Sequence, residues 1–266
     1  MGRAESFDAI DVAEHVRLPY SNGMKASFVQ IVIPTYNERE NIPSLIAEIR
    51  ARYPDADIVI VDDDSPDGTA DIVEMMAVSD SRLHLLRRRG RRSFARSLIE
   101  GMLWALAREP QFVIQMDADL SHHPQYIGDL LRAADEADLV IGSRYVGRRV
   151  NVINWPLSRL FLSVFANAYV RTITRLPVFD TTGGFRCWRA EALRAIDLPS
   201  IRSEGYAFQI ETLYRAHRLG HRVVEVPIIF TERNAGASKM STRIILESAI
   251  CPWLLLLWRS APRSRA

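Results

Sequence analysis

Short apolar segments of strand length alternate with segments of helical periodicity through the first half of this 266-residue chain. The apolar segments predict strands at residues 29–33, 58–61, 83–86, 112–116 and 139–141, with helices at about 67–77, 94–108 and 124–134. Asn37 is expected to cap a further helix, because apolar residues follow it at helical spacing. Repeated β–α units imply a parallel sheet covered on both faces. The sequence therefore predicts an α/β protein whose mostly parallel sheet is flanked by helices.

The length and composition are those of one large globular domain with a sizeable core. The chain is 48% hydrophobic and 25% charged, which is ordinary for a folded protein. Its net charge of +2 and its lack of finger or zipper motifs argue against a nucleic-acid binder. Only Cys187 and Cys251 are present, too few for a disulfide framework, so a reducing, cytoplasmic environment is expected.

The ends of the chain differ from its centre. Residues 1–27 are polar and predict a flexible leader, residues 28–242 form the predicted domain, and residues 243–266 are apolar with trailing arginines. No run of 18 apolar residues occurs, so a transmembrane helix is not expected. The C-terminal segment is interpreted as either membrane-interfacial or a buried helix. Residues 155–176 mix aromatic and basic side chains, which suits a membrane surface as well as packing on the sheet.

Acidic side chains follow two of the predicted strands. Asp117 and Asp119 come directly after one strand, and residues 62–64 are three consecutive aspartates that end another. Taken singly, each cluster could equally cap a helix or solvate a turn. Together they lie at the carboxyl ends of strands, where α/β sheets bind ligands. Carboxylate oxygens there suit Mg²⁺ or Mn²⁺, which commonly share their coordination with substrate phosphates.

Other nucleotide-binding and hydrolytic motifs are absent from the sequence. There is no G-x-G-x-x-G after the first strand, no G-x-x-x-x-G-K-[ST] and no G-x-S-x-G. These absences disfavour a dinucleotide-binding domain, a P-loop NTPase and an α/β-hydrolase. A nucleoside diphosphate bound through a metal fits the remaining pattern.

Ordered sequence blocks resemble a known enzyme family. Ile33–Glu38, Val61–Thr69 and Asp117–His122 are similar to the inverting glycosyltransferases of family 2, which have a GT-A fold. Further blocks at residues 142–145, 155–167, 180–186, 204–211 and 225–240 resemble polyprenol-phosphate (dolichol-phosphate) mannose synthases. The likeness covers about residues 28–242. It implies transfer of mannose from GDP-mannose, a nucleotide-sugar donor, to a polyprenyl monophosphate by a peripheral enzyme on the cytosolic face of a membrane, with glucose from UDP-glucose as the alternative.

The resemblance also implies roles for individual residues. Pro34, Tyr36, Glu38 and Asp63 would line the nucleoside pocket, and Asp117 and Asp119 would hold Mg²⁺ or Mn²⁺ on the donor diphosphate. The candidates for binding phosphate during transfer are Arg144, Arg159, Arg233 and Lys239. A lipid phosphate is largely dianionic at neutral pH, so the acceptor needs no general base.

One loop departs from the synthase pattern. Those enzymes usually have a basic residue followed by Gly-Leu-Gly, whereas Ser93 and Ala95 stand here in place of both glycines. Ser121 likewise stands where some relatives have an amide side chain. These changes leave open a third hypothesis, a catalytically weak nucleotide-sugar-binding or scaffolding subunit, although retention of Asp117 and Asp119 favours an enzyme. Reaching the membrane could also depend on an anchoring partner protein.

Overall fold

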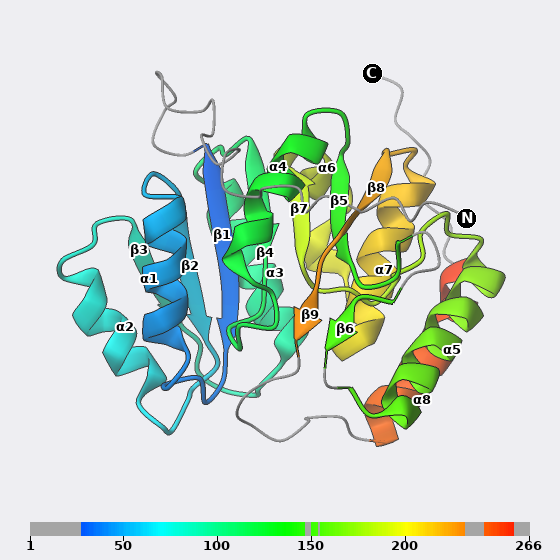
Figure 1. The fold of residues 1–266 in the computed structure, drawn as a ribbon, viewed down its shortest axis with the longest axis horizontal. Helices are drawn as coiled ribbons and strands as arrows, with labels where there is room; N and C mark the ends of the chain where they lie inside the picture. Colours follow the sequence, from blue (N-terminus) through cyan, green and yellow to red (C-terminus); the bar gives the residue numbers. More distant parts are fainter. Residues whose placement is uncertain (1–27, 147–149, 154, 232–241, 258–266) are drawn as a thin grey trace, which may run out of the picture.

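The computed structural model describes residues 28–146, 150–153, 155–231 and 242–257. Its centre is a seven-stranded sheet with the order β3-β2-β1-β4-β7-β5-β8 (Figure 1). The strands are β1 (Val29–Thr35), β2 (Asp57–Asp62), β3 (Leu83–Arg87), β4 (Phe112–Gln115), β5 (Leu139–Ser143), β7 (Arg186–Arg189) and β8 (Val223–Pro227). Only β7 runs antiparallel to its neighbours in this sheet. The predicted α/β class and mostly parallel sheet are confirmed.

Helices cover both faces of the sheet. One face packs against α1 (Ile42–Arg52), α2 (Thr69–Ala77) and α4 (Ile127–Ala134), and the other against α3 (Phe94–Leu106), α6 (Ala190–Ala195) and α7 (Gly205–Arg218) (Figure 1). The central residues of β1 are apolar because both faces of the sheet are covered: Ile31 and Ile33 join the core on the α1 side, and Val32 joins the core on the α3 side. In α3, a side chain at Gly101 would come within 2.5 Å of Val32, so glycine permits the close approach of this helix.

A helical pair lies beyond the β8 end of the sheet. Helix α5 (Leu157–Thr174) packs against α8 (Thr242–Leu257), and the two-stranded β6 (Val152–Ile153) and β9 (Phe230–Thr231) lie close to the start of α5 (Figure 1). The Tyr169 hydroxyl donates to the Ala249 carbonyl at 2.8 Å and accepts from Trp253 Nε1 at 2.9 Å. No helix among the described residues is both long and apolar enough to cross a bilayer. The proposed boundaries at residues 28 and 243 stay predictions, since residues 1–27 lie outside the described part.

Two local predictions differ from the structure. The prediction that Asn37 caps the first helix is wrong, because α1 begins at Ile42 after Asn41, and Asn37 has φ +58° in the turn after β1. Asparagine tolerates this left-handed conformation better than most residues, so Asn37 serves the turn and not the helix. The segment predicted as one helix at 124–134 is a 3₁₀ turn at Pro124–Tyr126 followed by α4.

Candidate active site

The carboxyl ends of β1, β2, β4 and β5 lie at one edge of the sheet, because these strands are parallel. Thr35 at the end of β1 pairs with Asp62 at the end of β2, so Tyr36 and Asp63 leave the sheet side by side. This edge also carries Asp117 and Asp119 after β4 and Arg144 after β5. The fold therefore brings the predicted nucleoside and metal residues to one place.

The first aspartate of the 62–64 cluster holds the turn rather than a ligand. Asp62 is buried, and its carboxylate accepts from the Thr35 hydroxyl at 2.9 Å and from the Ser65 hydroxyl at 2.6 Å. Glu38 is held nearby, because its backbone N–H donates to Thr69 Oγ1 and its carboxylate accepts from Asn41. These contacts tie the loop after β1 to the loop after β2.

The predicted nucleoside residues Tyr36 and Asp63 face the loop after β3. Asp63 is 7% exposed and forms an ion pair with Arg88, and its other oxygen accepts from the Ser93 backbone N–H at 2.7 Å. The Arg92 guanidinium lies over the Tyr36 ring, 4.3 Å from its centroid. The ring and the carboxylate are thus held in position by basic residues of a single loop.

Ser93 is one of the two residues that stand where the synthases usually have glycine, and its side chain makes two hydrogen bonds. Its hydroxyl accepts from the Arg96 N–H at the start of α3 and donates to the Glu204 carboxylate at 2.6 Å. Its φ of −162° is extended backbone, which any residue can adopt. Ala95 is 2% exposed within the core under α3. The loop accommodates both side chains, and Ser93 connects it to the start of α7.

Asp117 and Asp119 are contacted by Ser121 and His122, which lie in the same loop. Asp119 is 7% exposed, and its Oδ1 accepts from both the N–H and the hydroxyl of Ser121, the latter at 2.5 Å. His122 accepts the Asp117 N–H on Nδ1 at 3.0 Å and stacks on Phe185 with centroids 5.1 Å apart. His122 therefore braces the backbone of Asp117 against the Phe185 ring.

The surroundings of Asp117 suit a metal shared with a substrate. No group of three or more His, Cys, Asp or Glu side chains within the described ranges could hold an ion alone. Magnesium sites in transferases commonly use one or two carboxylates and complete their coordination with substrate phosphates. A side chain at Gly184 would contact Asp117 Oδ1 at 3.8 Å, so the glycine leaves this oxygen uncovered on that side. The two carboxylates and the glycine thus fit a metal that arrives with its donor.

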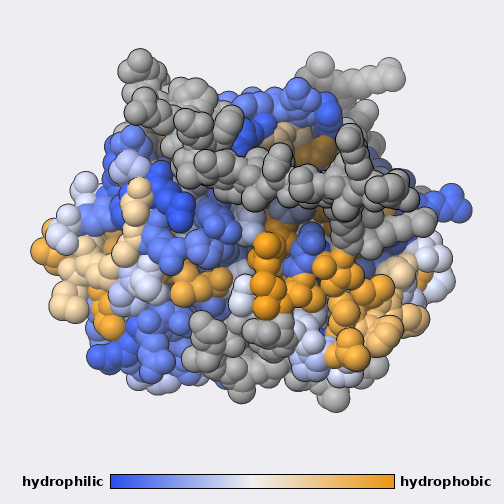
Figure 2. All heavy atoms as spheres, viewed as in Figure 1, coloured by the Kyte–Doolittle hydropathy of each residue, from blue (hydrophilic) through white to orange (hydrophobic). Residues whose placement is uncertain are grey.

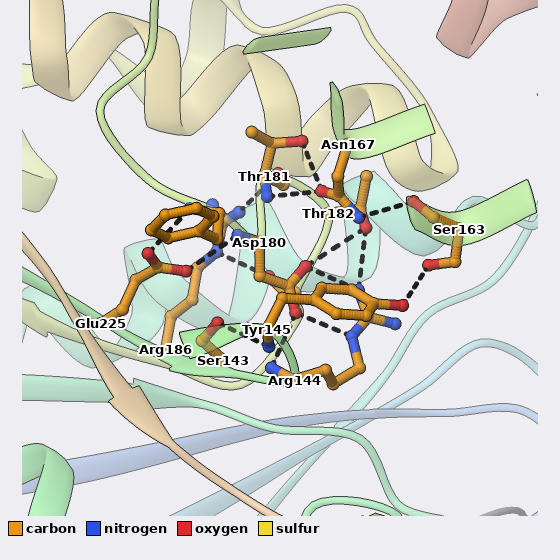
Figure 3. A network of polar contacts seen from close by, with 12 residues as sticks. Ser143, Arg144, Tyr145, Ser163, Asn167, Asp180, Thr181, Thr182, Arg186 and Glu225 are labelled. Atoms are coloured by element: carbon orange, nitrogen blue, oxygen red, sulfur yellow. Dashed lines mark hydrogen bonds and ion pairs between the residues drawn. The ribbon is translucent and has the colours of Figure 1, made fainter. Parts of the chain in front are cut away.

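Arg144 is part of a buried polar network (Figure 3). Its Nε and Nη2 each donate to the Asp180 carboxylate at 2.7 Å, and Nη2 also donates to the Thr182 hydroxyl. Burial opposes charge on both partners, but the pairing outweighs it: the pKa of Arg144 is raised and that of Asp180 is lowered. The prediction placed Arg144 on phosphate, whereas these contacts hold the loop that contains Asp180; its role toward substrate stays a prediction.

The same network reaches three other elements. Glu225 of β8 accepts the backbone N–H groups of Phe179 and Asp180, and Asn167 of α5 accepts from Thr181. Arg186 is fully buried and donates to the Gly183 carbonyl, and burial lowers the pKa of Arg186 to about 9, so it remains protonated at neutral pH. The Asp180 loop is therefore fixed from several sides.

Of the three remaining candidates for binding phosphate, the structure describes Arg159. The Arg159 guanidinium lies 4.2 Å from the centroid of the Trp155 ring at the start of α5. Phe230 contacts both Trp155 and His122, at centroid distances of 5.5 and 5.7 Å, so an aromatic bridge links this arginine to the acidic pair. Arg233 and Lys239 lie outside the described residues.

A separate cavity lies beside the site. It has a volume of about 200 Å³ and opens between the ends of β2 and β3, with Asp64, Ser65, Arg87 and Arg89 among its lining residues. Asp117 and Asp119 do not line it. It therefore belongs to the far side of the 62–68 turn and not to the acidic pair.

A family profile and two similar proteins point to the same class of enzyme. Residues 30–197 match the profile of glycosyl transferase family 2. An undecaprenyl-phosphate mannosyltransferase of Micrococcus luteus is 44% identical over 222 residues, which is 84% of this chain and 91% of that protein. A polyprenol monophosphomannose synthase of Mycolicibacterium smegmatis is 44% identical over 220 residues, 82% of this chain and 83% of that one.

The fold has solved counterparts. Glucosyl-3-phosphoglycerate synthase from Mycobacterium tuberculosis, in complex with Mn²⁺, uridine diphosphate and glucosyl-3-phosphoglycerate, superposes with a TM-score of 0.62. It shares 18% sequence identity, and the match covers 85% of this chain and 78% of that one. At this identity the likeness is one of fold, and it agrees with the GT-A arrangement expected from the sequence.

Proposed function

This chain belongs to glycosyl transferase family 2, and we propose that it transfers mannose from GDP-mannose to a polyprenyl monophosphate. Two relatives that are 44% identical over most of their length are named for mannose transfer to undecaprenyl phosphate and for polyprenol monophosphomannose synthesis. The observation that carries the proposal is the placement of Asp117 and Asp119 beside Tyr36 and Asp63 at one edge of the sheet. This combination suits a metal-bound nucleoside diphosphate.

The acidic pair would serve the leaving group. Asp117 and Asp119 would hold Mg²⁺ or Mn²⁺, which, when bound, neutralises the charge that develops on the departing nucleoside diphosphate. Ser121 holds the Asp119 carboxylate, and His122 holds the backbone of Asp117. Pre-positioned carboxylates lower the reorganisation needed when the donor arrives. Tyr36 would contact the nucleoside, and Asp63, with Arg88, would meet its polar edge.

The acceptor phosphate would act directly as the nucleophile. A phosphate oxygen attacks the anomeric carbon from the face opposite the diphosphate, the new C–O bond forms as the bond to the diphosphate breaks, and the nucleoside diphosphate leaves with the electron pair. The phosphate is already largely dianionic at neutral pH, so no proton has to be removed. Positive side chains are needed to bring two anions together, and Arg159, Arg233 and Lys239 would provide them.

An exposed apolar surface would bring the enzyme to its lipid acceptor. Leu157, Phe161 and Phe165 of α5 are 70%, 72% and 68% exposed, and Trp253 and Leu257 of α8 are 56% and 79% exposed. Figure 2 shows hydrophobic side chains gathered over α5. Large exposed apolar patches mark interaction surfaces, and aromatic residues suit the headgroup region of a bilayer. We assign this surface to contact with the cytosolic face of the membrane in which the polyprenyl phosphate resides.

Sugar transfer tests this proposal directly. Radiolabelled GDP-mannose, and in parallel UDP-glucose, would be incubated with polyprenyl phosphate with and without Mn²⁺ or Mg²⁺, and label would be counted in the organic extract. We expect metal-dependent label from GDP-mannose. Asp119→Asn should abolish it and weaken Mn²⁺-dependent binding of GDP in calorimetry, while Asp129→Asn, a control on α4 whose side chain is 40% exposed, should change neither.

The other outcomes are equally informative. Label from UDP-glucose alone would overturn the donor assignment and keep the reaction type. Absence of label from folded protein with either donor would favour the nucleotide-sugar-binding subunit. Full activity of Asp119→Asn would refute the metal site.

A further inference from the structure

A buried amide in α7 has no hydrogen-bond partner. Gln209 is 2% exposed, and neither its Oε1 nor its Nε2 bonds to any other atom in the described part of the chain. An unsatisfied buried amide is costly, so native proteins rarely keep one without a reason. The neighbouring polar residue Thr212 does find partners, since its hydroxyl accepts from Arg186 and donates to a backbone carbonyl one turn earlier. Among the described residues, Gln209 shares this property with one other buried glutamine, Gln115 of β4, whose two amide atoms also have no partner.

The amide faces the metal-side carboxylate across Gly184. A side chain placed on Gly184 would come within 3.6 Å of Gln209 Nε2, 3.8 Å of Asp117 Oδ1 and 3.4 Å of the His122 ring. These three groups therefore converge on the point that a Gly184 side chain would occupy. Gln209 approaches it from α7, on the sheet face opposite α1 and α4, while Asp117 approaches it from the end of β4.

The chemistry of an amide identifies what it would bind there. Gln209 offers one acceptor and two donors in a plane, so it can accept from one hydroxyl and donate to a neighbouring one. A pyranose carries hydroxyls on adjacent carbons, and the sugar of a nucleotide-sugar donor lies next to the diphosphate that the acidic pair would hold. A metal ion would use only the amide oxygen and leave both N–H donors unsatisfied.

We propose that Gln209 is a donor-sugar residue that hydrogen-bonds adjacent hydroxyls of the transferred sugar. This rests on the proposed function, because it presupposes a nucleotide-sugar donor on Asp117 and Asp119. The unsatisfied amide of the free protein becomes satisfied only when the sugar is present. A site built this way discriminates strongly against donors that lack the matching hydroxyls, since the amide would then stay buried without partners.

Calorimetric titration with two nucleotides separates sugar recognition from diphosphate recognition. GDP and GDP-mannose would each be titrated, with Mn²⁺, into the wild-type chain and into Gln209→Met, which preserves the length of the side chain without its amide. We expect the variant to bind GDP as the wild type does and to bind GDP-mannose about tenfold to a hundredfold more weakly. Gln30→Met, a buried glutamine at the other end of β1, should change neither affinity.

Thermal unfolding of the free protein gives a second, independent readout. Removing an unsatisfied buried amide should leave the melting temperature of Gln209→Met unchanged or raise it by about 2–4 °C. A lower melting temperature would show that the amide has a partner in the free protein and would overturn the proposal. Equal loss of affinity for both nucleotides would assign Gln209 to the metal or diphosphate instead, and unchanged affinity for GDP-mannose would remove it from the site. Failure of the wild-type chain to bind GDP-mannose would instead refute the proposed donor.

Discussion

Removing either partner of the Arg144–Asp180 pair should destabilise the fold strongly. The two side chains are 9% and 0% exposed, and they are joined by two bonds of 2.7 Å. Asp180 also accepts the Arg144 backbone N–H, so the carboxylate is bonded to one residue at three points. Arg144→Met would leave a buried carboxylate without its cation, and Asp180→Ala would leave a buried guanidinium without its anion.

The magnitude follows from this burial. Breaking a buried ion pair by removing one partner costs about 3–5 kcal/mol, whereas replacing both partners costs much less because no uncompensated charge remains. We therefore expect each single variant to lose about 3–5 kcal/mol of unfolding free energy. The double variant should lose less than either single variant, so its loss should fall short of the sum of the two single losses by more than about 3 kcal/mol.

Urea unfolding of the four proteins, followed by circular dichroism at pH 7, measures these terms as a double-mutant cycle. A loss of less than about 0.5 kcal/mol in Arg144→Met, the size expected of a surface substitution, would refute a structural role for the pair. Strict additivity of the two single losses would refute the direct coupling. Initial rates at varied polyprenyl phosphate, taken where each variant is still folded, show separately whether Arg144 also contacts the acceptor.

Other predictions concern the loop after β3, acid stability and the apolar surface. Ser93→Ala should cost about 1–2 kcal/mol, because it removes the cap of α3 and the bond to Glu204; an unchanged urea midpoint would contradict that role. Because the pKa of Asp180 is lowered in the folded protein, its stabilising contribution is complete above its ordinary value of about 3.9 and is lost as the pH falls through the folded value. The stability difference between wild type and Asp180→Asn should therefore shrink below about pH 4, and a constant difference down to acid unfolding would contradict the assigned shift. Phe161→Glu with Phe165→Glu should reduce sedimentation with anionic vesicles while leaving the melting temperature unchanged, and equal vesicle binding would exclude this face as the contact.

The local pattern of apolar residues was sufficient to predict strands β1 to β5. Each strand predicted between residues 29 and 141 is present. A short apolar run between two helical segments is too short for a buried helix, so a strand is the structure it favours. The acidic pair was also predictable, since Asp117 and Asp119 directly follow such a run and the ends of parallel strands meet at one edge.

The second half of the sheet was not predicted from pattern. Strand β7 is four residues long, has arginine at both ends, and lies antiparallel between β4 and β5. Its sequence gives no strand-like alternation, and Arg186 is buried only because loop carbonyls and Thr212 accept from it. Helix α7 is buried along most of its length, and its buried residues include polar ones such as Gln209, Thr212 and Arg215, so apolar spacing alone does not reveal which face is buried.

The chain's own pattern decides the fold class, the strands that carry the acids and the type of ligand they suit, because these depend on neighbours within a few residues. Tertiary structure alone decides which side chains become partners. Arg144 and Asp180 are 36 residues apart, and Ser93 and Glu204 are 111 apart. Gln209 reaches the space beside Asp117 only because α7 packs against the loop that contains Gly184. Burial and pairing of charges depend on contacts between distant segments, and no spacing within one segment encodes them.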